Sequence, residues 1–172
     1  QQNKDVTNLI FCRVPGAKFK HFKSDPTRPY PYMVLRLGLS CPNGSVPVSR
    51  FFDNEDQSNS NLHEGNIYPN VSDKNTRLSL CHFTGTYSNP GFALMEKFPD
   101  FGFEYGVFAA EDFTYALEKG TVFTDDENSN NSNSLVNLTN DGIVEYILEP
   151  VGGDTRLHLA KVGNTRTGEG SA

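Results

Sequence analysis

The chain has 172 residues and a formal net charge of −6 at pH 7, which argues against nucleic acid as its main partner. It has no run of roughly 18 apolar residues, the length that a membrane-spanning helix needs, so we expect no membrane insertion. The length suits one domain with a sizeable core, and 15 Gly, 10 Pro and 13 Phe are typical of an all-β protein with many turns.

Short β-branched or aromatic runs bounded by turn residues predict strands along the whole chain. In order, they cover residues 9–14, 18–23, 33–40, 46–52, 77–83, 101–108, 121–124, 144–150 and 156–162. The exception is 109–119, where apolar residues fall on one helical face and Gly120 can end a helix. Because most strands leave one face polar, we expect an antiparallel β-sandwich with one short helix.

Two phrases recur in the same order. The matched strings are FFDNED at 51–56 with FTDDEN at 123–128, each followed by an Asn-Ser-Asn tract, and TRLSL at 76–80 with TRLHL at 155–159. Such matches indicate an internal duplication of a unit of roughly 75 residues. We therefore predict a single β-domain with pseudo-two-fold symmetry over 1–162, built from fused repeats at about 10–83 and 79–162. Residues 163–172 are expected to form a flexible tail.

Weaker matches extend the repeat upstream. Tyr-Pro at 30–31 with Gly38 parallels Phe-Pro at 98–99 with Gly106. The string FCRV at 11–14 also resembles LCHF at 80–83. The second match predicts that one strand ends the first repeat and begins the second.

Three cysteines leave at least one outside any intrachain disulfide. The repeat places Cys41 opposite Ala109 and Cys81 opposite Ala160, so both partners are missing together from the second copy. A Cys41–Cys81 disulfide explains that joint absence, whereas a Cys12–Cys41 bond would leave one partner behind. Three buried thiols are the alternative. With Cys41 and Cys81 bonded, Cys12 is free to link two chains into a dimer.

The duplicated acidic strings are the main candidate for a metal site. Calcium takes about six to eight oxygen ligands from carboxylates, amides, backbone carbonyls and water, and a strand end followed by an Asx-rich loop offers all of these. The expected Ca²⁺ ligands are the carboxylates of the two strings, Asp53, Glu55, Asp56, Asp125, Asp126 and Glu127. The alternative is a purely structural loop, in which Asp and Asn side chains bond to nearby backbone groups.

Other residues are candidates for binding a glycan. Lysines and aromatic residues mix over 18–23 and continue into tyrosines that could stack on a sugar, although a lysine-protected edge strand is the alternative. The expected ligand contacts are Tyr30, Tyr32, Asn59, Asn61, Asn131 and Asn133. The leucines of the TRLxL phrases alternate with polar residues, which predicts core strands. Capture of a phosphate or carboxylate by Arg77 and Arg156 is the alternative.

Catalytic motifs are scarce. The four histidines show neither HxH nor HExxH spacing, and no Gly-x-Ser-x-Gly or phosphate-binding glycine loop is present. We expect a secreted or cell-surface, non-enzymatic binding or adhesion module with calcium-stabilised acidic loops, whose partner is an extracellular glycan or a surface protein. The alternatives are a dedicated glycan-binding domain, a polysaccharide hydrolase with paired carboxylates, and a purely structural surface module.

Overall fold

The computed structural model describes residues 9–23, 31–54, 71–72, 75–84, 93–127, 130–137 and 142–163. Its strands are β1 (Tyr32–Leu35), β2 (Val46–Phe52), β3 (Val71–Ser72), β4 (Thr76–Phe83), β5 (Tyr105–Ala109), β6 (Glu118–Thr124), β7 (Ser134–Asn137), β8 (Leu148–Val151) and β9 (Asp154–Val162). The described part also holds a 3-10 helix, η1 (Gly16–Lys18), and one α-helix, α1 (Ile143–Ile147). The fold is thus mostly antiparallel β with a single short α-helix.

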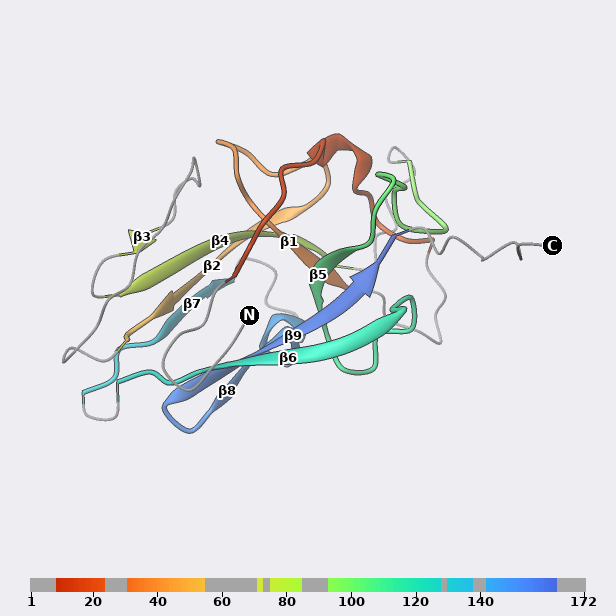
Figure 1. Ribbon diagram of the computed structural model, residues 1–172. Helices are drawn as coiled ribbons and strands as arrows, with labels where there is room; N and C mark the ends of the chain where they lie inside the picture. Colours follow the sequence, from red (N-terminus) through yellow and green to blue (C-terminus); the bar gives the residue numbers. More distant parts are fainter. Residues whose placement is uncertain are drawn as a thin grey trace.

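All nine strands belong to one antiparallel sheet (Figure 1). The order is β6-β9-β5-β1-β4-β2-β7, with β3 added beside β4 and β8 beside β9. We call β1, β4 and β2 the first arm, and β5, β9 and β6 the second arm. The arms join in the middle of the sheet, where Tyr32 lies opposite Ala109 and Met33 opposite Phe108.

The far ends of the arms meet a second time. Asn54, just after β2, faces Asp126, just after β6, in an isolated antiparallel bridge. The backbone N–H of Glu127 donates to the carbonyl of Asp53 at 2.6 Å. The sheet therefore bends until two strands from opposite sides of its order come together, at the lower left of Figure 1.

Strand registers in the two arms correspond to one another. The corresponding pairs are Phe52–Thr76 with Thr124–Thr155, Phe51–Arg77 with Phe123–Arg156, and Val34–Cys81 with Val107–Ala160. Both recurring phrases therefore occupy matching places in their arms. The upstream matches do not follow these registers. The registers make Val34 correspond to Val107, and with that alignment Gly38 and Gly106 no longer fall at corresponding positions. Residues 11–14 form no strand, whereas 80–83 end β4.

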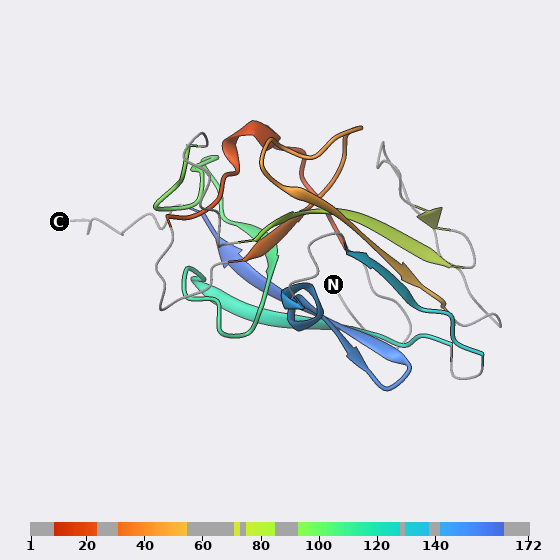
Figure 2. The same cartoon turned by 180° about the vertical axis from the view of Figure 1, so that it is seen from behind.

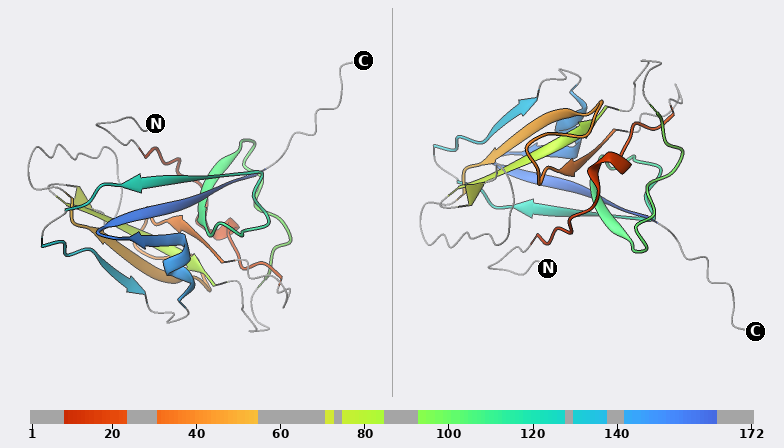
Figure 3. Two further views of the ribbon diagram at one scale, coloured as in Figure 1. Left: turned by 90° about the horizontal axis from the view of Figure 1, so that it is seen from below. Right: turned by 90° about the horizontal axis from the view of Figure 1, so that it is seen from above.

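Side chains of the central strands are buried on both faces of the sheet. On one face, an aromatic cluster packs around the ring of Tyr32, which stacks on Phe83 with ring centroids 4.6 Å apart. Phe19, Phe22, Phe98 and Phe113 complete it. On the other face, the arms share an aliphatic core with Val144 and Ile147 of α1. Figure 2 shows this helix between the two arms, and Figure 3 shows the same bend from above and below.

Several predicted elements differ from the structure. The helix expected over 109–119 is wrong: Phe113 N–H donates to the Ala110 carbonyl in a turn, and β6 begins at Glu118. Successive turns can bury residues at the same spacing as a helix face. The strand expected over 144–150 instead starts inside α1, because a short apolar run does not distinguish strand from helix. The strand at 18–23 is replaced by η1 and extended chain, and β7 was not predicted.

Cys41 and Cys81 form a disulfide that ties the loop after β1 to β4. A turn places Cys41 there, since Ser45 N–H donates to the Pro42 carbonyl at 3.1 Å and Gly44 adopts a φ of 88° that favours glycine. This is the pairing that the repeat favours. Cys12 is free and exposed.

Replacing Cys41 and Cys81 together by Ala should lower the free energy of unfolding by about 3–4 kcal/mol, because the bond closes a chain separation of 40 residues. Urea denaturation measures this loss. The matched control Cys12→Ala should stay within about 0.5 kcal/mol of wild type. A double variant as stable as wild type would show that the bond does not constrain the unfolded chain.

Candidate functional site

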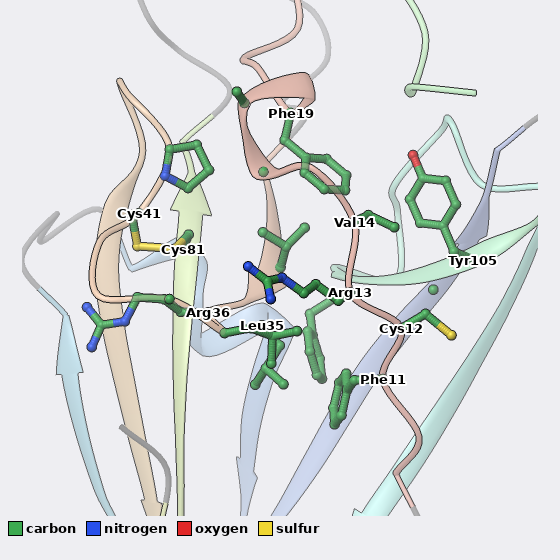
Figure 4. A pocket seen from close by; sticks show the side chains of 18 of the residues that line it. Phe11, Cys12, Arg13, Val14, Phe19, Leu35, Arg36, Cys41, Cys81 and Tyr105 are labelled. Carbon is green, nitrogen blue, oxygen red and sulfur yellow. A yellow bond between two sulfur atoms is a disulfide. The ribbon is translucent and has the colours of Figure 1, made fainter. Parts of the chain in front are cut away.

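A cavity of about 940 Å³ lies at the edge where β1 ends and β5 begins (Figure 4). Residues 9–17, which we call the strap, cross it on one side. The segment after β1, including the Cys41–Cys81 disulfide, forms another wall, and residues 103–106 form a third. Three segments that are distant in the sequence therefore line one space, which is partly open to solvent.

The strap is held by aromatic packing at both of its ends. Phe11 lies against Phe108, with ring centroids 6.4 Å apart. Phe19, just beyond η1, is buried and contacts the rings of Tyr32, Phe83, Phe101 and Tyr105. Figure 4 shows the extended strap directing Phe11 and Arg13 to one side and Cys12 and Val14 to the other.

The lining of the cavity is mainly apolar, with a few charged groups. The apolar wall includes Phe11, Val14, Phe19, Val34, Leu35, Phe108 and Leu159. The charged lining residues are Arg13, Lys20, Arg36 and Glu104. The Glu104 carboxylate lies 3.1 Å from Lys161 Nζ, a cation outside the lining that also pairs with Glu118 at 2.7 Å.

Tyr105 adds no negative charge to this space. Burial, with a smaller effect from the Asp100 carboxylate, raises the pKa of Tyr105 well above its ordinary value. Its hydroxyl donates to the Pro99 carbonyl at 2.9 Å. The phenol is therefore neutral at physiological pH.

The duplicated acidic strings lie elsewhere, where the arms meet. We call Asp53, Asn54, Asp126, Asn133 and Thr155 the acidic corner. The Asp126 carboxylate is fully buried and accepts hydrogen bonds from Asn133 Nδ2 at 2.8 Å, Thr124 Oγ1 at 3.0 Å, Asn54 Nδ2 at 3.2 Å and Thr155 Oγ1 at 3.3 Å. Asp53 Oδ2 accepts from the backbone N–H and hydroxyl of Ser132, each at 2.8 Å.

Charge at the acidic corner is balanced from within the protein. Arg50 is buried and donates to Thr155 Oγ1, and its positive charge favours the ionised form of Asp126. Burial is the stronger effect, so the pKa of Asp126 is raised despite Arg50 and the hydrogen bonds from Asn133, Thr124 and Thr155.

Corresponding contacts recur on the two sides of the acidic corner. Asn54 N–H donates to Asn75 Oδ1 at 3.0 Å, and Asp126 N–H donates to Asp154 Oδ1 at 3.0 Å. Thr76 Oγ1 donates to Asn54 Oδ1 at 2.8 Å, as Thr155 does to Asp126. The recurring residues thus make the same backbone-fixing bonds in each arm.

The structure describes the expected calcium site only in part. Across the described ranges, no group of three or more His, Cys, Asp or Glu side chains is arranged to hold a metal ion. Protein donors already occupy the oxygens of Asp126 and Oδ2 of Asp53, and Asp125 is exposed. Glu127 contributes backbone groups, accepting from Asn131 Nδ2. Glu55 and Asp56 lie outside the described residues, so a calcium site that uses them stays a prediction.

Of the expected glycan contacts, the structure describes Tyr32, Asn131 and Asn133. Tyr32 is fully buried and donates its hydroxyl to the Lys20 carbonyl at 2.6 Å, so its ring cannot stack on a sugar. The side-chain amides of Asn131 and Asn133 both donate to the Gly153 carbonyl, so they make hydrogen bonds within the protein. Tyr30, Asn59 and Asn61 lie outside the described residues.

The charged residues of the cavity were missed at the level of sequence. Arg13, Arg36 and Glu104 stand in unrelated stretches, and no spacing connects them. Arg13 falls in the string at 11–14, which resembles a copy of a strand, and Lys20 falls in the basic aromatic stretch 18–23.

Comparisons with known proteins found no matching family model, no similar curated protein and no similar solved structure. Within the part of the chain that the structure describes, no helix is both long and apolar enough to span a bilayer.

Asp126→Asn should change how stability depends on pH. Because the folded pKa of Asp126 is raised above its ordinary value of 3.8, its stabilising contribution is complete below that value and is lost as pH rises through the folded pKa. The free energy of unfolding of wild type relative to the variant should therefore fall over that window and then level off. Urea denaturation between about pH 3 and pH 7 measures it.

The exposed neighbour provides the control, since Asp125→Asn should stay within about 0.5 kcal/mol of wild type at neutral pH. A wild-type advantage over Asp126→Asn that grows with pH would contradict the raised pKa.

Proposed function

We propose that this chain is a non-enzymatic binding domain that takes an apolar small molecule into the cavity under the strap. The cavity itself carries the proposal. Its volume of about 940 Å³ falls within the range of ligand pockets, about 300–1,000 Å³, and its apolar wall with a few polar groups has the composition of such pockets.

The fixed position of the cavity walls supports binding. Covalent linkage fixes one wall at Cys41 and Cys81, and aromatic contacts of Phe11 and Phe19 fix the strap. A pocket with walls held in place loses less conformational entropy when a ligand binds, which favours affinity.

The charged groups favour binding over hydrolysis. A glycoside hydrolase requires two carboxyl groups flanking the bond that is cleaved. Glu104 is the one carboxylate among the described residues that line the cavity, and it is paired with Lys161. For the same reason we do not assign the alternative of a polysaccharide hydrolase.

We place the protein outside the cell, as a secreted or surface module. Disulfides persist mainly in oxidising compartments, and the Cys41–Cys81 bond supports this placement. Adhesion to a surface protein or glycan remains a second role of such a module, and the exposed Cys12 supports a disulfide-linked dimer.

We also infer that the chain arose by internal duplication and that its arms are the two layers of a β-sandwich. The corresponding registers and the repeated contacts of Asn54 and Asp126 support the duplication. The aliphatic core, which draws Val48 and Leu78 from the first arm and Leu157 from the second, supports the sandwich.

Gly106→Phe should abolish ligand binding by filling the cavity. Gly106 lines the cavity, its φ is not in the left-handed region, and a Cβ added there would meet no atom within 4 Å. We expect at least a tenfold loss of affinity (about 1.4 kcal/mol) for Nile red, an uncharged apolar dye, measured by fluorescence titration.

Gly120→Phe is the matched control, because Gly120 also lies in a strand with open space around its Cβ but does not line the cavity. It should bind the dye like wild type. Equal binding by wild type and Gly106→Phe would place the dye elsewhere and remove the proposal.

A further inference from the structure

We propose that the ligand of the cavity is a free anionic amphiphile, a long-chain carboxylate whose head group is held by Arg13 and whose hydrocarbon chain lies against the apolar wall. This inference rests on the proposed function and narrows it to one class of ligand.

Charge complementarity is the first argument. The whole chain carries a formal charge of −6, yet the described residues lining the cavity include three cations, Arg13, Lys20 and Arg36, and one carboxylate. That carboxylate, Glu104, shares Lys161 with Glu118, and the phenol of Tyr105 stays neutral. An acidic protein thus surrounds a cavity whose own charge attracts anions.

The position of Arg13 is the second argument. Figure 4 shows its side chain extending from the strap across the cavity, toward the wall formed by Leu35. Arginine keeps its charge at any physiological pH, and its planar fork of N–H donors matches a carboxylate with two parallel hydrogen bonds. The strap that carries it is anchored by Phe11 and Phe19, so the guanidinium is presented from a fixed backbone.

The apolar wall is the third argument, because it excludes a small, fully hydrated anion as the natural ligand. Val34, Leu35, Phe108 and Leu159 offer hydrocarbon surface next to the cations. A ligand that satisfies both halves of this lining needs a charged end and an apolar body, which is the definition of an amphiphile.

The test compares decanoate, decanol and decylamine, which share a chain length and differ in charge. Each is titrated below its micellar concentration against the intact protein with its disulfide formed, by displacement of bound Nile red and by calorimetry. Decanoate should bind at least tenfold more tightly than decanol, as expected for a charge-assisted hydrogen bond, and decylamine should bind most weakly.

Variants assign the preference to the cavity. Arg13→Gln should weaken decanoate binding about tenfold and leave decanol within about twofold of wild type, and Arg13→Lys should restore part of the loss. Arg36→Gln tests the second guanidinium in the lining. Arg77→Gln is the control for overall charge, since Arg77 lies on β4 over the Phe51 ring, away from the cavity. This variant should bind decanoate like wild type.

The outcomes separate this inference from the proposed function. If decanol binds as tightly as decanoate and Gly106→Phe blocks both, the cavity binds apolar ligands but the anionic preference is wrong. If Gly106→Phe blocks none of the three, or wild type binds none, the proposed function fails as well. Sedimentation with phosphatidylglycerol vesicles, without uptake of free decanoate, would point to a membrane surface and overturn the free amphiphile.

Discussion

Two short contacts join the arms of the sheet: the β1–β5 pairing at Tyr32 and Met33, and the bridge between Asn54 and Asp126. Each arm alone is a three-stranded sheet with an apolar face that water would cover. Closing the bend places Leu78 of one arm and Leu157 of the other in the same core, and burial of such side chains supplies the main driving force for folding. Because the β1–β5 pairing is short, the angle between the two arms depends on the bridge between Asn54 and Asp126.

That second contact depends on a charge placed where water cannot reach it. An ionised carboxylate is costly to bury unless hydrogen bonds and an opposite charge compensate for it. Asp126 receives donors from both arms, while Arg50 comes from the first arm alone. The acidic corner therefore joins the two arms through hydrogen bonds and a charge contact supplied by the protein itself.

Sequence patterns were most informative where local chemistry decides the structure. Alternating residues defined β2, β4 and β9, and the two phrases fell at matching registers. The disulfide was predicted because both of its cysteines correspond to alanines in the second repeat. The registers support half of that argument: Cys81 does correspond to Ala160, but Cys41 does not correspond to Ala109. For the acidic strings, sequence does not show which protein donors will reach a carboxylate, so the hydrogen bonds of Asp126 could not be predicted. The cavity was invisible, since the strap and residues 103–106 meet only in the folded chain.

The bridge at Asn54 and Asp126 also bears on how such a molecule could have begun. If the chain arose by the proposed duplication, a pair of identical ancestral subunits would have brought either two amides or two carboxylates face to face at this bridge. Two acids would repel until one of them took up a proton, whereas two amides would leave a buried guanidinium without its counter-ion. Once the two halves are one polypeptide, corresponding positions can carry different residues. Arg50 then corresponds to Val122, and the Asp126 carboxylate faces the Asn54 amide. Such chemical asymmetry is open to a fused gene and closed to a homodimer.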